Sequence, residues 1–177
     1  GTRDTLAALL PGAGYAVRTE QHVPAWTRRR TLRNGRQVTE RAVLDLQLEA
    51  PPEAPKTWVD CVHPFPSASA HRGGAATENG YAAARAEEDK HARYPPGRAD
   101  GRLEAFAQEL YGRFGDEAIR FLRRATGRAC TRTSALAVLG EERPPAVLGS
   151  WLQRLSCALQ KNNAAALRAA AGAAACW

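Results

Sequence analysis

The sequence predicts an α/β domain, in which a central mixed β-sheet of about four strands is flanked by helices and followed by a C-terminal helical extension. Three observations lead to this prediction. Residues 42–49 place alanine and leucine side chains on one face and Asp45 on the other, as a half-buried strand does. Residues 75–93 contain no proline and are rich in alanine, glutamate and arginine, which favours a helix. With 177 residues, the chain is long enough for one such domain and too short for two well-packed ones.

The elements before this strand are a short helix, a strand and a hairpin. Residues 4–10 are expected to form a helix that stops at Pro11. Residues 15–23 alternate in the manner of a strand. The dipeptide Asn34-Gly35 suits a two-residue type I′ turn and therefore predicts a hairpin with a basic, exposed tip.

The elements that follow are a second strand and several helices. Residues 57–63 predict a strand, and residues 103–111 are compatible with either a strand or the start of a helix. A helix is expected over residues 116–127, with Asp116 as its cap and Gly127 at its end. A last amphipathic helix begins after Pro145 and runs into an alanine-rich tail that we expect to fray.

The charge of the chain indicates a polyanionic partner. Lysine and arginine number 25 against 18 aspartates and glutamates, which gives a net charge of +7. An arginine-rich composition unrelated to binding would give the same charge. The four cysteines form no CxxC pair and no Cys/His cluster with zinc-ligand spacing, so no zinc site is expected.

The sequence contains no signal peptide and no apolar stretch of about 18 residues, so neither secretion nor a membrane partner is expected. We therefore expect the cysteines to be ordinary buried thiols of an intracellular protein. The chain begins with Gly1 and contains no methionine, and we expect it to be part of a longer polypeptide.

Two aspartates on neighbouring predicted strands are the candidate chemical centre. Asp45 and Asp60 are separated by a length that one hairpin connection spans, so their carboxylates are expected to converge. Such a pair suits Mg²⁺ or Mn²⁺, which prefer hard oxygen ligands and activate water for attack on a phosphodiester. Lys90 is the candidate for a positive charge beside that phosphate, or for orienting the water. A solvated charged face would also explain Lys90 and its acidic neighbours.

The same residues carry a resemblance to a known family. The chain reads W-V-D-C-V-H-P over residues 58–64 and D-K-H-A-R-Y over residues 89–94. This is similar in order and spacing to D-V-T-V-P followed by a helix with K-x-x-K/R-Y in the restriction-like endonuclease domains of site-specific non-LTR retrotransposons, a branch of the PD-(D/E)XK nucleases. Residues 103–118 and 154–160 resemble the region downstream of that nuclease core, and the likeness spans roughly residues 15–160.

The chain departs from the pattern of the PD-(D/E)XK class at two places. The lysine of the class stands two positions after the second acidic residue, where this chain has Val62; in the retrotransposon branch it lies on the following helix, as Lys90 does. The first motif of the branch is usually Pro-Asp or Ala-Asp after an arginine, whereas here Arg41 is followed by Ala-Val-Leu and then Asp45.

The resemblance implies a Mg²⁺- or Mn²⁺-dependent DNA endonuclease that nicks or cuts its target. Residues 1–125 would form the nuclease core and residues 126–177 the helical extension with its low-complexity tail. DNA would be the partner, a reverse-transcriptase domain would lie upstream in the same polypeptide, and the protein would be nuclear. The departures leave open an alternative, a catalytically inactive nucleic-acid-binding or scaffold module that keeps the nuclease fold.

The resemblance also assigns roles to side chains. Asp45, Asp60 and Lys90 would be catalytic, and Asp45, Asp60 and Glu20 would bind the metal. Arg28 and other arginines crowd the predicted hairpin, where they either contact DNA phosphates or are simply solvated. The candidates for nucleic-acid contact are Arg29, Arg30, Arg33, Arg36, Arg93 and Arg113.

Overall fold

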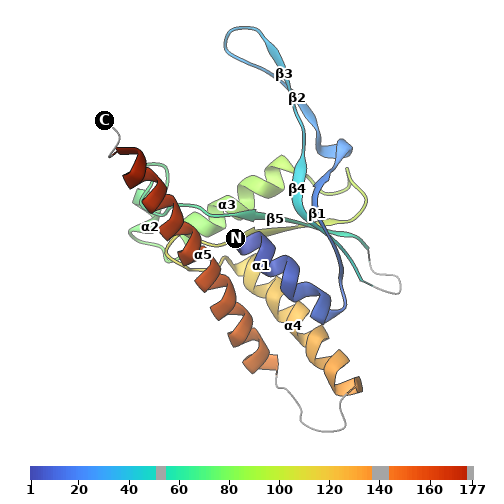
Figure 1. The fold of residues 1–177 in the computed structure, drawn as a ribbon. Coiled ribbons are helices and arrows are strands. Elements are labelled where there is room, and N and C mark those ends of the chain that lie inside the picture. Colours follow the sequence, from blue (N-terminus) through green and yellow to red (C-terminus); the bar gives the residue numbers. More distant parts are fainter. Residues whose placement is uncertain (51–54, 137–143, 175–177) are drawn as a thin grey trace.

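A four-stranded mixed sheet forms the centre of the protein, as the sequence predicted (Figure 1). The structure is a computed structural model that describes residues 1–50, 55–136 and 144–174. The strand order is β1-β4-β5-β6; the first three strands are antiparallel neighbours, and β6 runs parallel to β5. The strands are β1 (Ala16–His22), β4 (Val43–Glu49), β5 (Thr57–Val62) and β6 (Arg102–Ala107).

Helices cover both faces of this sheet. The face that carries Val59 and Phe106 packs against a group of helices to form the main core, and Trp151 and Leu155 of the C-terminal helix belong to the same core. The opposite face packs against one helix, whose Ala83 lies against the sheet. The helices of the first face are α1 (Thr2–Leu9), the short 3₁₀ helix η1 (Leu10–Ala13), α4 (Asp116–Leu136) and α5 (Pro144–Ala174); the helix of the second face is α3 (Tyr81–Arg93).

Side-chain alternation along β5 decides what faces α3. Successive residues of a strand point to opposite faces. Val59 joins the main core, so Trp58 and Asp60 point to the other side. Parallel strands need a crossover connection, and α3 lies in the crossover from β5 to β6. This topology brings α3 over Asp60.

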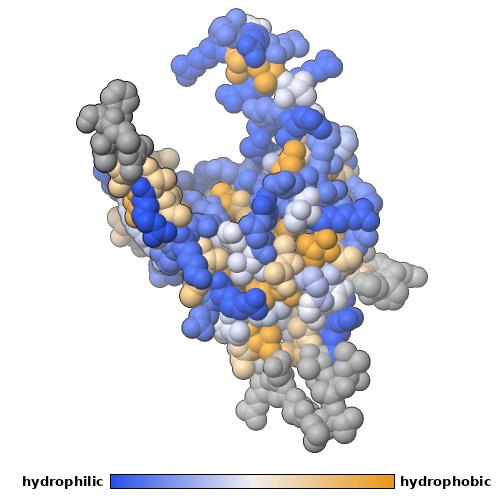
Figure 2. All heavy atoms as spheres, viewed as in Figure 1, coloured by the Kyte–Doolittle hydropathy of each residue, from blue (hydrophilic) through white to orange (hydrophobic). Residues whose placement is uncertain are grey.

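A basic hairpin projects from the body of the protein between β1 and β4 (Figure 1). Its strands are β2 (Arg28–Thr31) and β3 (Gln37–Glu40), and Figure 2 shows that its surface is mostly hydrophilic. The predicted hairpin is confirmed, but its loop is longer than the expected two residues. Gly35 adopts φ = 78°, and its backbone N–H donates to the carbonyl of Leu32 at 2.9 Å, which closes the wider loop.

Aromatic packing anchors the base of the hairpin. Trp26, in the 3₁₀ helix η2 (Pro24–Trp26), is buried against Trp58 and Tyr94, with ring centroids 6.5 and 5.4 Å away. Its indole N–H donates to the carbonyl of Pro95 at 3.0 Å. The hairpin is therefore fixed to the end of α3.

Several helix boundaries differ from the sequence prediction, and three of these differences are large. The helix expected from residue 75 begins at Tyr81, because the short helix α2 (Arg72–Ala75) precedes it and Gly80 interrupts the helix with φ = 88°. The helix expected to end at Gly127 continues to Leu136, since Ala129 and Cys130 extend its buried face. The tail expected to fray after residue 162 continues as α5, while residues 175–177 lie outside the described part.

The ambiguous segment at residues 103–111 is a strand, β6, as far as Ala107. Within the described ranges, no helix is both long enough and apolar enough to cross a membrane.

Candidate active site

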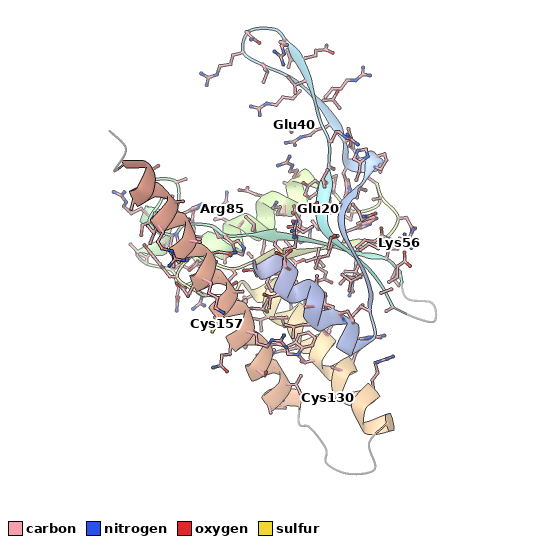
Figure 3. The ribbon with its side chains drawn as sticks, in the orientation of Figure 1. Glu20, Glu40, Lys56, Arg85, Cys130 and Cys157 are labelled. Atoms are coloured by element: carbon pink, nitrogen blue, oxygen red, sulfur yellow. The ribbon has the colours of Figure 1, made fainter. Side chains whose placement is uncertain are left out.

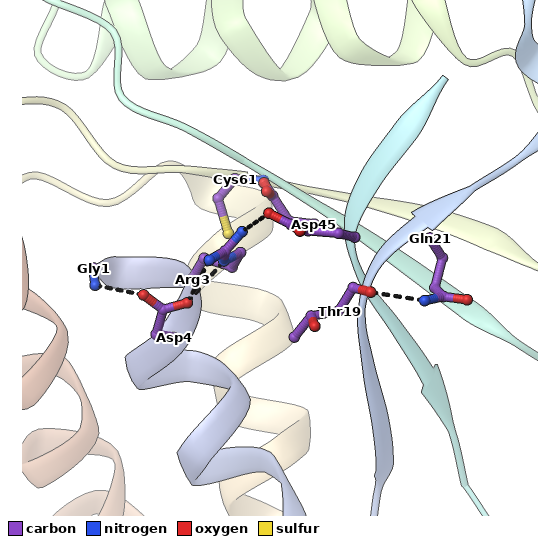
Figure 4. A network of polar contacts seen from close by, with 8 residues as sticks. Gly1, Arg3, Asp4, Thr19, Gln21, Asp45 and Cys61 are labelled. Atoms are coloured by element: carbon purple, nitrogen blue, oxygen red, sulfur yellow. Dashed lines mark hydrogen bonds and ion pairs between the residues drawn. The ribbon is translucent and has the colours of Figure 1, made fainter. Parts of the chain in front are cut away.

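Asp45 and Asp60 lie opposite each other on adjacent strands. The register pairs Leu46 of β4 with Val59 of β5, so the next row places Asp45 opposite Asp60. Directly opposed residues have Cβ atoms about 4.5–5.5 Å apart and side chains on one face. Asp45 Oδ2 also accepts a hydrogen bond from the backbone N–H of Cys61 at 2.7 Å, and Figure 4 shows Asp45 beside Cys61. The two carboxylates therefore converge.

Lys90 of α3 reaches this pair. Its Nζ atom lies 2.6 Å from Oδ2 of Asp60, and the side chains of Lys90 and Asp60 are only 20% and 8% exposed. Burial raises the pKa of Asp60 above its ordinary value, the nearby charge of Asp45 adds to the rise, and the hydrogen bond from Lys90 opposes it. The structure thus brings together the three residues that the sequence singled out for catalysis.

Buried glutamates fix α3, and the sequence did not single them out. Glu109, after β6, accepts a hydrogen bond from the backbone N–H of Ala83 in the first turn of α3, at 3.2 Å. Glu87 of α3 accepts from the backbone N–H of Glu117 in the first turn of α4, at 3.0 Å. Both bonds satisfy N–H groups that a helix leaves without partners. They hold α3, and so Lys90, against this face of the sheet.

A second contact between α3 and α4 lies one helical turn further along. His91 Nε2 is 2.7 Å from Glu117 Oε2, and Glu117 Oε1 accepts from the backbone N–H of Ala105 in β6 at 2.7 Å. The only sequence signal for this contact is an acidic residue at the start of a helix, where the helix dipole favours it.

The carboxylate of Glu20 pairs with Arg3 of α1. Thr19 and Gln21 of β1 pair with Leu46 and Leu44 of β4, so Glu20 lies beside Asp45 in the sheet. The backbone of Glu20 has φ = 52°, and its side chain is 66% exposed. Its Oε1 atom lies 2.5 Å from Nη1 of Arg3 in α1. The metal-ligand role of Glu20 stays a prediction.

The predicted DNA-contacting arginines occupy different places. Most lie on the hairpin and are exposed: Arg29, Arg30, Arg33 and Arg36. Arg93 is one helical turn after Lys90. Arg113 lies beside Gly80, at the N-terminal end of α3. This end is about 15 Å from Lys90 along the helix axis, because an α-helix rises 1.5 Å per residue. The structure groups Arg93 with the site and separates Arg113 from it.

Cys61 follows Asp60 in the chain but is not a candidate nucleophile. Burial raises the pKa of its thiol well above the ordinary value, and the charges of Asp45 and Asp60 add to the rise. A thiol that stays protonated is a poor nucleophile.

Comparisons of the chain with known protein families, with curated proteins and with solved structures found no match. The resemblance to the retrotransposon nucleases stays a prediction. The geometry of the site carries the functional argument.

Proposed function

We propose that this chain is a Mg²⁺- or Mn²⁺-dependent DNA endonuclease domain of the restriction-like type. The observation that carries the proposal is the convergence of Asp45, Asp60 and Lys90, with Lys90 Nζ 2.6 Å from Asp60 Oδ2. These residues come from β4, β5 and α3, and the fold brings them to one face of the sheet.

The two carboxylates fit a hydrated divalent cation. Mg²⁺ commonly takes one or two protein carboxylates and keeps several water ligands. Among the described residues, no group of three or more histidines, cysteines, aspartates or glutamates is arranged to hold a metal ion. Asp45 and Asp60 would supply protein ligands to such an ion, and Glu20 stays a candidate for a further one. A bound Mg²⁺ would lower the pKa of a water molecule and neutralise charge on the phosphate.

Lys90 can serve both Asp60 and a substrate. An ammonium group has three N–H donors, and the bond to Asp60 uses one of them. A phosphate oxygen can accept from another donor. Because charge on a phosphate grows as the attacking oxygen approaches, this contact strengthens in the transition state and accelerates cleavage.

The charge distribution favours DNA as the substrate. The chain carries a net charge of +7, and the projecting β2–β3 hairpin presents several exposed arginines. A two-stranded ribbon is narrow enough to enter the major groove of DNA. Arginine contacts to phosphates position a protein on DNA without reading its sequence.

The test is cleavage of supercoiled plasmid with Mg²⁺ or Mn²⁺. The wild type should convert the plasmid to nicked or linear forms, and Asp45→Asn, Asp60→Asn and Lys90→Met should each lower the rate by about 100-fold or more, as loss of electrostatic transition-state contacts does. Asp89→Asn is the matched control, because Asp89 is exposed and adjoins Lys90 in the sequence. Wild-type cleavage by Asp60→Asn would refute the assignment.

One observation favours a second candidate function. Asp60 is paired with Lys90 in the free protein, which lessens the negative charge available to a metal. A nucleic-acid-binding or scaffold module that keeps a nuclease fold would have this pairing without cleavage. A wild type that binds DNA yet cleaves with neither metal would support that alternative.

A further inference from the structure

Three arginines converge on one carboxylate at the base of the hairpin. Glu40 Oε2 lies 2.8 Å from Nε of Arg28 and 3.9 Å from Nη2 of Arg93, and Glu40 Oε1 lies 3.5 Å from Nη1 of Arg30. Arg28 and Arg30 belong to β2, whereas Arg93 ends α3. Figure 3 shows Glu40 where the hairpin meets the body of the protein.

The register of the hairpin separates this cluster from the other arginine of β2. Arg28 pairs with Glu40 and Arg30 with Val38, so these residues share one face of the ribbon. Arg29 lies between them in sequence and therefore points to the opposite face. The face with Arg28 and Arg30 is the one that meets α3.

The cluster adjoins the candidate active site through Tyr94. Lys90 Nζ lies 6.0 Å from the centroid of the Tyr94 ring, and Arg93 Cζ lies 5.5 Å from the same centroid. Lys90 and Arg93 are one helical turn apart on α3. Successive phosphates of one DNA strand are spaced by about 3.4 Å along the helix axis. A strand with one phosphate at Lys90 therefore carries a neighbouring phosphate within reach of Arg93.

The cluster has positive charge in excess. Three guanidinium groups face one carboxylate, and the side chains of Arg28, Arg30 and Arg93 are 50%, 65% and 42% exposed, against 24% for Glu40. The hydrogen bond from Arg28 holds the pKa of Glu40 below its ordinary value, so Glu40 stays negative. Guanidinium groups match the oxygens of a phosphate as well as those of a carboxylate.

We propose that Arg28, Arg30 and Arg93 form a binding site for a DNA backbone phosphate next to the one that is cleaved, and that Glu40 occupies this site in the free protein. The position relative to the cleaved phosphate rests on the proposed nuclease function; the anion site and its occupation by Glu40 do not.

If Glu40 occupies the phosphate site, removing its charge should raise the affinity for DNA. DNA must displace the carboxylate before it can bind these arginines, so Glu40 competes with the substrate. A carboxylate with a purely structural role would instead help binding, by holding the arginines in place. Removing its charge therefore distinguishes the two roles.

The first experiment measures duplex DNA binding by fluorescence anisotropy without a divalent metal. Glu40→Gln keeps the shape of the side chain and should lower Kd by about threefold, as expected from loss of an exposed ion pair. Glu88→Gln is the matched control, because it also removes one negative charge and frees one arginine, Arg85, whose pair with Glu88 lies on α3 away from Glu40 (Figure 3). Unchanged or weaker binding by Glu40→Gln, with a wild-type circular dichroism spectrum, would overturn the proposal.

The second experiment locates the phosphate and does not need Glu40→Gln to fold. Single phosphates of the duplex are replaced in turn by neutral methylphosphonates. The wild type should lose affinity at one particular phosphate, and in Arg93→Ala this sensitivity should be smaller while sensitivity elsewhere is unchanged. An Arg93→Ala profile identical to that of the wild type would overturn the proposal. Neither experiment uses cleavage, so a failure of the nuclease proposal is recorded separately.

Discussion

Lys90 donates to Asp60 across a 2.6 Å contact that links the end of α3 to the middle of β5. Asp60 is 8% exposed and has a second carboxylate, Asp45, in the opposite strand. An isolated buried charge is costly, and the attraction between paired charges offsets part of that cost. The pair therefore stabilises the fold in addition to its proposed chemistry.

A double-mutant cycle should show this coupling. Lys90→Met leaves Asp60 buried beside Asp45, and we expect the free energy of unfolding to fall by about 3 kcal/mol. Asp60→Asn should cost less, because the 20% exposure of Lys90 lets its amine reach water. The double variant should lose less than the two single variants together. Urea denaturation followed by circular dichroism gives the three values, and strict additivity would contradict the coupling.

Glu87 should give the protein a measurable dependence of stability on pH. Burial raises the pKa of Glu87 above the ordinary 4.5, with the charge of Glu117 adding to the rise and hydrogen bonds from backbone N–H groups opposing it. The folded state therefore holds the Glu87 proton more tightly than the unfolded state. Stability from this group is fully present below pH 4.5 and is lost as pH rises through the raised pKa.

The comparison that isolates this effect is wild type against Glu87→Gln. A glutamine can still accept the hydrogen bond from the backbone N–H of Glu117 and does not titrate. The wild type should lose stability relative to Glu87→Gln as pH rises from 4.5, and chemical denaturation at several pH values measures the difference. A difference that is constant with pH, or that changes in favour of the wild type, would show that the pKa of Glu87 is not raised.

The candidate site could be predicted because its signals are local. The two-residue period of β4 places Asp45 opposite the leucine face, and the period of β5 puts Asp60 on the face of Trp58. Two antiparallel strands joined by a short connection then bring the aspartates together. The prediction of Lys90 also required the order of the family motif, because spacing along a helix does not indicate which sheet residue the helix covers.

The supporting contacts could not be predicted, since they join segments distant in the sequence. Glu109 and Glu87 look like surface residues until the packing of α3 and α4 places them at helix ends. Glu20 was assigned to the metal by family likeness, and its contact with Arg3 depends on where α1 packs. The wider hairpin loop arose because Asn34-Gly35 specifies a turn but not where the flanking strands resume.

Trp26 should be essential for stability at the base of the hairpin. It is 4% exposed, packs on Trp58 and Tyr94, and donates its indole N–H to Pro95. Trp26→Ala should lower the free energy of unfolding by about 3–5 kcal/mol, as large aromatic deletions do. Leu32→Ala, in the exposed loop of the hairpin, should change it by less than about 0.5 kcal/mol. Equal effects of both changes, measured in urea, would contradict the anchoring role.

The hairpin should supply a large share of the affinity for DNA. A variant with four arginines replaced by alanine should weaken binding almost equally for all sequences, because phosphates carry no sequence information. Each lost phosphate contact removes about 0.9 from the slope of log affinity against log salt concentration, so the loss of all four contacts should flatten the slope by about 3.6 units. The residues to replace are Arg29, Arg30, Arg33 and Arg36.

A second quadruple variant controls for net charge. It removes four exposed arginines from α4 and α5, on the face of the sheet opposite α3, and so carries the same charge as the hairpin variant. If the hairpin contacts DNA directly, the control should keep most of the wild-type slope in anisotropy titrations across a salt series. Equal flattening in both variants would assign the affinity to net charge alone and leave the hairpin without a specific role. The control positions are Arg123, Arg132, Arg154 and Arg168.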